Sequence, residues 1–208
     1  MTKIRSEGEM IKWALGDQWK DLCPDIQRRF EKNPDIGKPL IYRGTLRELT
    51  ASFWGKILAK IAKPLIGGAL IPHTDYNFPV DIQVYCKEDG NHVYKHRIYK
   101  LNNRKPIEFV SHMEQHEDGK RLREYVGAGL GMFLVASAKD GDLHFRSDGY
   151  FWEIGKLRIP LPDILSPGKT KLSHNNTGGD KFSIRIDIDH IIFGKMFTQE
   201  GVFEELHE

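Results

Sequence analysis

Residues 80–85 read Val-Asp-Ile-Gln-Val-Tyr, a regular alternation of apolar and polar side chains. Successive side chains of a β-strand point to opposite faces of its sheet, so this period of two predicts a strand with one buried face. The same alternation returns in residues 184–189, which read Ile-Arg-Ile-Asp-Ile-Asp. Two distant segments therefore predict β-structure across the region that begins at Phe78.

Turn signals divide this region into short segments. Gly, Asp, Asn, Pro and Ser, the residues that favour tight turns, cluster at residues 88–91, 118–119, 140–141, 166–168 and 177–180. Between them we predict strands at residues 93–101, 107–117, 121–126, 143–154, 169–174 and 182–192. Because no helical pattern separates these strands, they predict an antiparallel β-meander that forms a partly closed barrel or a strongly curved sheet.

The preceding part of the chain has a different period. Residues 17–32 carry Trp19, Leu22, Ile26 and Phe30 at helical spacing, and Pro24 either breaks this segment or starts a second helix. Residues 39–46 predict a first strand. We therefore expect a single α+β domain over residues 1–208, mostly helical in residues 1–72 and antiparallel β in residues 73–208.

Residues 52–66 give the clearest helical pattern. Ser52 is a suitable N-cap, and an apolar stripe lies between Lys56, Lys60 and Lys63. We expect four residues of this stripe to pack against the sheet: Trp54, Ile57, Leu58 and Ile61. The same Lys-rich amphipathic pattern is found in helices that lie on membrane surfaces, so this interpretation stays open.

Charge and cysteine content exclude several classes of protein. The net charge of +2 comes from 31 basic and 29 acidic residues that are well mixed, whereas a nucleic-acid binder carries a concentrated basic face. Residues 1–12 lack the apolar core of a secretory signal. Two cysteines, Cys23 and Cys86, are too few for a disulfide framework, so reduced thiols are expected. These features predict a cytoplasmic protein, and they leave its oligomeric state open.

Several short motifs resemble a known bacterial family, number 4166 among the domains of unknown function. They lie at both ends of the chain: residues 15–19 (Leu-Gly-Asp-Gln-Trp), 22–24 (Leu-Cys-Pro), 145–151 (Phe-Arg-Ser-Asp-Gly-Tyr-Phe), 159–162 (Ile-Pro-Leu-Pro), 165–168 (Leu-Ser-Pro-Gly) and 199–203 (Gln-Glu-Gly-Val-Phe). The resemblance implies a stand-alone domain or a C-terminal appendix to a nucleotide-dependent oxidoreductase-like module. It implies no catalytic residue. The Pro-Leu-Pro and Ser-Pro-Gly segments predict a structural corner.

Two motifs invite a catalytic interpretation that their context does not support. Residues 127–131 read Gly-Ala-Gly-Leu-Gly. They do not match the dinucleotide-binding fingerprint Gly-x-Gly-x-x-Gly, because Met132 occupies the position of its third glycine. A glycine-rich bend between two strands is expected instead. Asp187, Asp189 and His190 resemble acid–base residues, but they alternate with isoleucines and so predict a solvated outer face.

Histidine is the residue type with the most regular placement. A hairpin turning at residues 103–105 would pair Lys100 with Glu108 and Tyr99 with Phe109. The same register would place His96 opposite His112, and His92 opposite His116, with Glu114 between the two pairs. Opposed Cβ atoms lie about 4.5–5.5 Å apart, so each pair could chelate a divalent metal. The alternative to a metal site is that these histidines form an exposed polar face. No cofactor other than a divalent metal is expected.

The predicted architecture favours binding over catalysis. A curved sheet with an amphipathic helix across its mouth encloses an apolar cavity. Aromatic residues would supply its walls: Trp54, Tyr85, Tyr99, Phe109, Phe145, Tyr150, Phe151 and Trp152. We therefore expect a non-catalytic domain that binds an apolar or amphipathic small molecule or lipid, unless these rings fill a solid core. The alternatives are an enzyme or oxidoreductase accessory domain, and a membrane-surface adaptor that uses helix 52–66.

Overall fold

The structure is a computed structural model that describes residues 6–87 and 92–206. Two short helices and a 3₁₀ turn form the first part of the described chain. They are α1 (Glu7–Leu15), η1 (Gly16–Asp21) and α2 (Pro24–Glu31). Ser6 caps α1, because its side chain accepts from the Glu9 amide at 3.0 Å while the Glu9 carboxylate accepts from the Ser6 amide at 3.1 Å. Pro24 starts α2, as one of the two sequence alternatives predicted.

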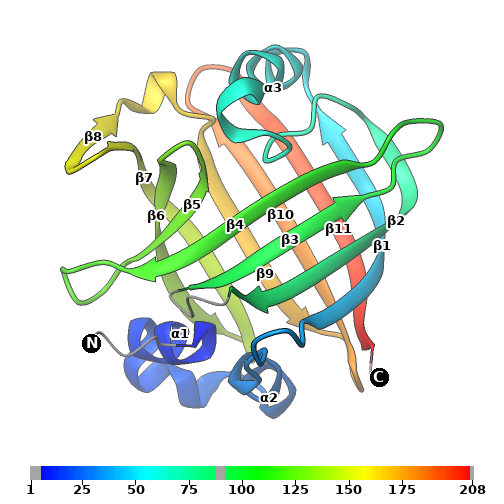
Figure 1. Ribbon diagram of the computed structural model, residues 1–208, viewed down its shortest axis with the longest axis vertical. Coiled ribbons are helices and arrows are strands. Elements are labelled where there is room, and N and C mark those ends of the chain that lie inside the picture. Colours follow the sequence, from blue (N-terminus) through cyan, green and yellow to red (C-terminus); the bar gives the residue numbers. More distant parts are fainter. Residues whose placement is uncertain (1–5, 88–91, 207–208) are drawn as a thin grey trace.

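The rest of the chain forms a closed barrel of ten antiparallel strands, which confirms the predicted α+β fold class (Figure 1). The strands are β1 (Leu40–Ala51), β2 (Asp75–Cys86), β3 (Val93–Tyr99), β4 (Ile107–Gln115), β5 (Leu122–Gly127), β6 (Leu130–Lys139), β7 (Asp142–Ile154), β9 (Lys169–Asn176), β10 (Lys181–His190) and β11 (Gly194–Leu206). The ring closes where β6 pairs with β7 and where β1 pairs with β11.

An excursion leaves the ring between β7 and β9. It consists of the edge strand β8 (Leu157–Leu161), which pairs only with β7, and the turn η2 (Asp163–Leu165). The ladder is thus broken between Leu161 and Lys169, which confirms the predicted structural corner. The predicted bend at residues 127–131 is also present, between β5 and β6. The turn expected at residues 88–91 lies outside the described residues.

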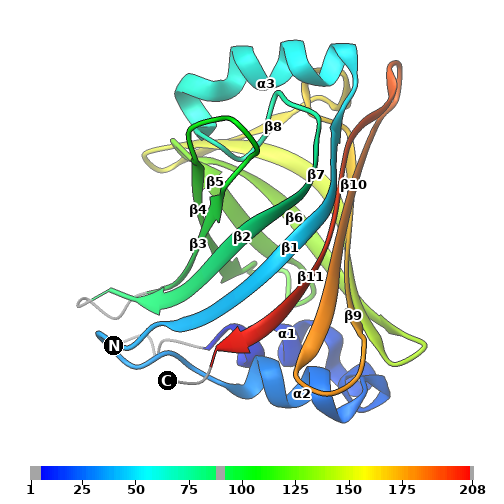
Figure 2. The same ribbon diagram turned by 90° about the vertical axis from the view of Figure 1, so that its right-hand side faces the viewer.

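Helices cover opposite ends of the barrel (Figure 2). At one end, α1 and α2 bury Ile11 and Ile26 against Leu122 and Leu143 of the wall. At the other end lies α3 (Phe53–Ile66), whose bounds match the prediction and whose N-cap is Ser52. This arrangement leaves the barrel interior between two helical covers.

The face that α3 buries differs from the prediction. Gly55, Ala59 and Ile66 are its buried residues, whereas Trp54 is 46% exposed and Ile61 is 70% exposed. The reason is steric: a Cβ at position 55 would lie 2.5 Å from the Met196 carbonyl oxygen, so only small residues allow α3 to approach β11 this closely. Phe53, Trp54 and Ile61 consequently remain largely exposed, whereas Leu58 packs against the core.

The predicted register of β3 and β4 is wrong by two residues. Tyr94 lies opposite His112, and His96 lies opposite Val110, so neither predicted histidine pair forms. The loop explains the shift: Lys100 Nζ bonds Asp81 at 2.6 Å rather than Glu108, and the Lys100 amide donates to the Pro79 carbonyl. A slip of two keeps every side chain on its predicted face, because the side-chain period of a strand is two.

Candidate functional site

A cavity of about 440 Å³ lies inside the barrel. Its walls extend from Leu58 and Ala62 of α3 to Phe30 of α2, and inward-facing strand residues such as Val84 and Ile186 make most of them apolar. Pockets that hold small organic ligands typically measure about 300–1,000 Å³ and have this composition. The barrel is therefore not solidly packed.

The aromatic residues selected from the sequence separate into two groups. Five line the cavity: Tyr99, Phe109, Phe145, Tyr150 and Trp152. Three do not line it. Trp54 stacks on Phe193 at 4.6 Å, Tyr85 stacks on Tyr94 at 5.6 Å, and Phe151 packs against Tyr125 at 5.3 Å.

Arg29 of α2 brings a cation to the end of the cavity nearest the N-terminal helices. Its guanidinium carbon lies 3.8 Å from the ring centroid of Phe182 and 5.1 Å from that of Phe30. Its Nη2 atom is buried without a hydrogen-bond partner in the described part of the chain. Burial lowers the pKa of Arg29 to about 10, which means that these surroundings do little to compensate its charge.

His174 of β9 shares these aromatic neighbours. Its ring centroid lies 5.3 Å from that of Phe30 and 6.4 Å from that of Phe182. Its Nδ1 atom is also buried without a partner among the described residues. Burial, reinforced by the charges of Arg29, Lys95 and Arg97, lowers the pKa of His174 well below its usual value. The imidazole is therefore neutral at pH 7.

Two cations of β3 also face the cavity, and only one of them has carboxylate partners. Lys95 Nζ lies 3.0 Å from Glu7 Oε1 and 3.3 Å from Glu124 Oε2. Burial alone would lower the pKa of Lys95, but Glu124 and Glu7 outweigh it and raise that pKa. Arg97 instead donates to Ser111 Oγ at 2.9 Å, and within the described ranges no carboxylate forms an ion pair with it.

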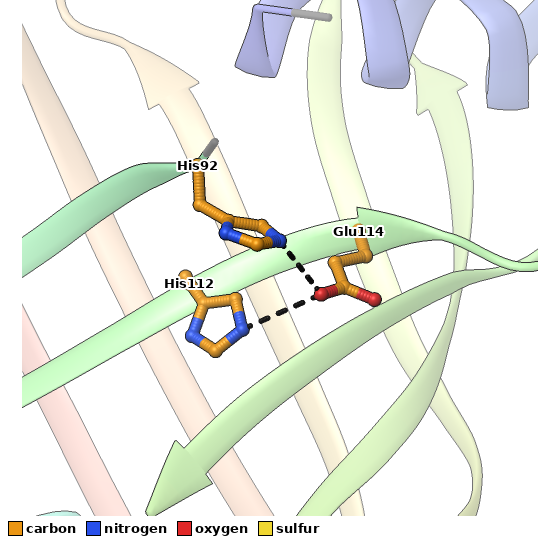
Figure 3. Close-up of side chains that lie close together, drawn as sticks. All are labelled: His92, His112 and Glu114. Atoms are coloured by element: carbon orange, nitrogen blue, oxygen red, sulfur yellow. Dashed lines mark ion pairs between the residues drawn. The ribbon is translucent and has the colours of Figure 1, made fainter. Parts of the chain in front are cut away.

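A histidine–carboxylate cluster lies on the outer face of the same wall. Val93 and Lys95 of β3 and Met113 of β4 line the cavity, so their neighbours His92, His112 and Glu114 point outward. Figure 3 shows the two histidine rings converging on one Glu114 oxygen. The distances to Oε1 are 2.9 Å from His92 Nε2 and 3.6 Å from His112 Nε2.

The other two histidines of the predicted metal cluster lie elsewhere. His96 Nε2 is 2.9 Å from Glu108 Oε2. His116 Nδ1 is 3.2 Å from Asp118 Oδ1, and its ring packs edge-on against Phe133. The expected set of His92, His96, His112, His116 and Glu114 is thus reduced to three residues that meet.

The acidic end of β10 is held in local contacts. Asp187 accepts from Thr198 at 2.9 Å and from Arg185 at 2.7 Å. His190 Nδ1 accepts from the amides of Ile192 and Phe193 at 3.1 and 3.3 Å. Asp187 therefore faces outward, as the alternation predicts, while His190 orders the turn that follows.

Comparison with known families decides the classification. The family model described as "Domain of unknown function (DUF4166)" matches residues 22–203, most of the chain. The chain belongs to this family. The resemblance inferred from the sequence motifs is thereby confirmed. No curated protein and no solved structure matches the chain.

The DUF4166 match includes the parts of the molecule that form the cavity. The match runs from Leu22 to Phe203 of β11. Helix α2, with Arg29, and nearly the whole barrel therefore lie within it. Helix α1, which supplies Glu7 to Lys95, lies outside it. None of the helices in the described residues is long and apolar enough to cross a membrane.

Five polar or charged residues of this DUF4166 cavity were not predicted from the sequence: Arg29, Lys95, Arg97, Glu124 and His174. A signal was present for two of them. In residues 93–99, Lys95 and Arg97 occupy the same alternate positions as Val93 and Tyr99, so the four must share one face. No such pattern predicted the position of Arg29, because the direction of its side chain depends on how α2 packs against the barrel.

Proposed function

We propose that this domain binds an amphipathic small molecule non-catalytically inside its barrel. The molecule's apolar body lies in the cavity and its anionic end lies at Arg29. The observation that carries this proposal is an apolar cavity of about 440 Å³ that ends at a buried guanidinium whose Nη2 atom has no hydrogen-bond partner among residues 6–87 and 92–206.

The apolar part of the ligand has a clear driving force. Removing apolar surface from water stabilises a complex by roughly 25 cal/mol per Å². The wall residues around the middle of the cavity, such as Val84, Ile184 and Ile186, offer no strong polar contact. An alkyl or ring system fits this environment better than a sugar or a nucleotide does.

The anionic end of the ligand follows from Arg29 and Arg97, with which no carboxylate of the described residues forms an ion pair. A buried charge without a counter-charge is costly, so proteins normally pair it or place a ligand against it. The nearest carboxylates are engaged elsewhere, since Glu7 bonds Lys95 and Glu205 bonds Lys32 at 2.6 Å. A ligand carboxylate can accept hydrogen bonds from Arg29 and from His174, and Arg97 adds a positive charge on the opposite wall.

The test compares dodecanoic acid with dodecan-1-ol, which has the same chain length but no charge. We expect the acid to bind more tightly. Arg29→Met should weaken acid binding roughly 10–100-fold, because a hydrogen bond to a charged group contributes about 1.5–3 kcal/mol, and should leave alcohol binding nearly unchanged. Titration calorimetry measures both ligands.

Arg28→Met is the matched control. Arg28 is the neighbouring residue of α2, where it pairs with Asp25 at 2.8 Å on the surface, so its loss should change neither affinity. Failure of both ligands to bind would contradict the binding function itself. Equal affinities that Arg29→Met does not alter would contradict only the anionic end.

A second candidate function is docking on an anionic membrane surface through the α3 end of the barrel. Phe53 is 70% exposed and Ile191, in the turn between β10 and β11, is 76% exposed. Trp54 of α3 stacks on Phe193 of that turn, so the exposed residues form one surface, which we call the α3-end patch: Phe53, Trp54, Ile61, Leu65, Ile191, Ile192 and Phe193.

The charges around the α3-end patch favour an anionic surface as its partner. Lys56, Lys60 and Lys63 lie on α3 between the apolar residues. Burial lowers the pKa of His73, and the nearby charges of Arg104 and these three lysines lower it further, which indicates a positive potential. Exposed apolar side chains interspersed with lysines fit the headgroup region of a bilayer. Ile61 and Leu65 also line the cavity, so a docked barrel would open toward lipid.

We also propose that the domain works in the cytoplasm. Cys23 and Cys86 are both free thiols, and reduced cysteines are typical of that compartment.

A further inference from the structure

The outer face of β3 and β4, away from the cavity, brings three potential metal ligands together. Tyr94 lies opposite His112, and His92 lies two residues before Tyr94, just ahead of β3. His112 and Glu114 are two residues apart on β4 and share its outer face. Because His92 Nε2 lies 2.9 Å from Glu114 Oε1, a residue at the start of one strand meets two residues of the neighbouring strand.

We propose that His92, His112 and Glu114 bind one zinc ion, with a fourth coordination position open to water or an anionic ligand.

The positions of the donor atoms fit this coordination. The His92 and His112 Nε2 atoms lie 2.9 and 3.6 Å from Glu114 Oε1, and the three ligand atoms all lie within 4.8 Å of one another. Tetrahedral zinc with bonds of about 2.0–2.1 Å holds its donor atoms about 3.3 Å apart. The two distances to Oε1 lie on either side of this value, and both rings are directed at that oxygen (Figure 3).

Neighbouring side chains fix the orientation of the ligands. The His112 ring stacks on Tyr125 with a centroid separation of 4.9 Å and an interplanar angle of 4°. Arg123 Nη2 binds Glu114 Oε2 at 3.0 Å, which leaves Oε1 directed at the histidines. Tyr125 in turn donates to Glu153 Oε2 at 3.1 Å. Such outer contacts are typical of metal sites, because they hold the ligands before the ion arrives.

The chemistry of the ligands selects the class of ion. Two imidazoles and one carboxylate suit zinc and its neighbours among the first-row divalent metals, whereas calcium and magnesium prefer oxygen ligands alone.

Cobalt(II) provides a spectroscopic probe for this site, since it adopts zinc geometries and absorbs visible light. Chelator-treated protein without a purification tag should bind one Co²⁺ per chain, with the intense absorption of four-coordinate cobalt, and Zn²⁺ should displace it. His92→Ala and His112→Ala should each weaken binding at least about tenfold. Metal-free circular dichroism and melting curves check that each variant is folded.

His96→Ala is the matched control, because His96 lies on the same face of β3 but pairs with Glu108. Its affinity should equal that of the unaltered protein. The proposal is overturned if no stoichiometric binding occurs, or if His96→Ala weakens binding as much as His92→Ala does. Should His112→Ala fail to fold because it removes the stack on Tyr125, His92→Ala decides the question alone, since His92 precedes β3.

Discussion

His174 is a buried titratable group surrounded by positive charge. Burial is the largest cause of its lowered pKa, and basic residues from several elements lower it further: Arg29 from α2, Lys95 and Arg97 from β3, and His144 from β7. Its Nδ1 atom has no partner in the described residues. Protonating this imidazole in the folded state would add a further charge beside Arg29 and Arg97, which form no ion pair with a carboxylate in the part of the chain that the structure describes.

This environment predicts acid sensitivity. Because the folded-state pKa of His174 is lowered, the unfolded chain binds more protons once the pH falls below about 6.5, the usual histidine value. The free energy of unfolding should therefore fall with pH, by at most about 1.4 kcal/mol per pH unit from this residue. His174→Phe, which keeps an aromatic ring beside Phe30 and Phe182, should make that slope shallower. Urea unfolding between pH 7 and 5 measures it, and equal slopes would contradict the prediction.

The inward-facing residues of the strands show which features of the cavity the sequence predicts and which it does not. The alternation places Tyr99, Phe109 and Phe145 on inward faces, and they do line the cavity. The same alternation places Lys95 and Arg97 inside, yet a polar residue in such a pattern is normally assigned to solvent. The carboxylates that accompany Lys95 inside the barrel, Glu7 and Glu124, are far from it in the sequence, so the alternation does not predict these contacts.

Helix α3 shows what the sequence of a single element predicts. Its bounds were predicted correctly, but the face that it buries was not. Ser52 and the apolar stripe define where the helix begins and runs. Which side faces the barrel depends instead on Gly55 and Ala59, whose small size permits close approach to the wall. Hydrophobicity alone predicted that the larger side chains would be buried, but Trp54 and Ile61 belong to the exposed α3-end patch, while Leu58 packs against the core.

The β3–β4 hairpin shows a related limit. Alternation determined which face each residue occupies, and that part of the prediction is correct. The two-residue shift in pairing comes from contacts outside the hairpin, where Lys100 bonds Asp81 of β2 and Asn102 bonds Asp75 at 2.8 Å. Contacts with a third strand set the register of β3 and β4, and the sequence of the hairpin itself does not reveal them. This register decides which histidines lie close together.

The α3-end patch gives a prediction for membrane binding. Vesicles containing phosphatidylserine should bind the protein more strongly than neutral phosphatidylcholine vesicles do. A triple variant, Lys56→Glu, Lys60→Glu and Lys63→Glu, should weaken this binding roughly a hundredfold, because each lysine near such a surface contributes about 1 kcal/mol. Vesicle co-sedimentation measures the affinity.

Three exposed lysines away from α3 provide a control with the same change in net charge: Lys20, Lys38 and Lys139. Their triple change to Glu should leave vesicle binding close to that of the unaltered protein. Equal losses in the two triple variants would indicate a general charge effect and would contradict docking through the α3-end patch.

For the whole molecule, closure of the barrel determines what the cavity can do. The first and last strands pair along Ile41 to Ala51, and β7 divides its length between β9 and β8. These long-range pairings could not be located from local patterns, which predicted only a barrel or a curved sheet. Closure leaves the interior without sheet edges, and helices cover both ends of the barrel (Figure 2).

A ligand enclosed by the folded barrel should stabilise the whole domain, because the unfolded chain offers no such enclosure. Dodecanoic acid at a hundred times its dissociation constant should add about 2.7 kcal/mol to the free energy of unfolding. For a chain of this size that corresponds to a rise in Tm of about 5–10 °C. Arg29→Met, with tenfold weaker binding at the same acid concentration, should lose about 1.4 kcal/mol of this effect, whereas Arg28→Met should retain it all. Differential scanning calorimetry over a series of acid concentrations provides the measurement. A Tm that stays constant as the acid approaches saturation would contradict binding inside the folded barrel.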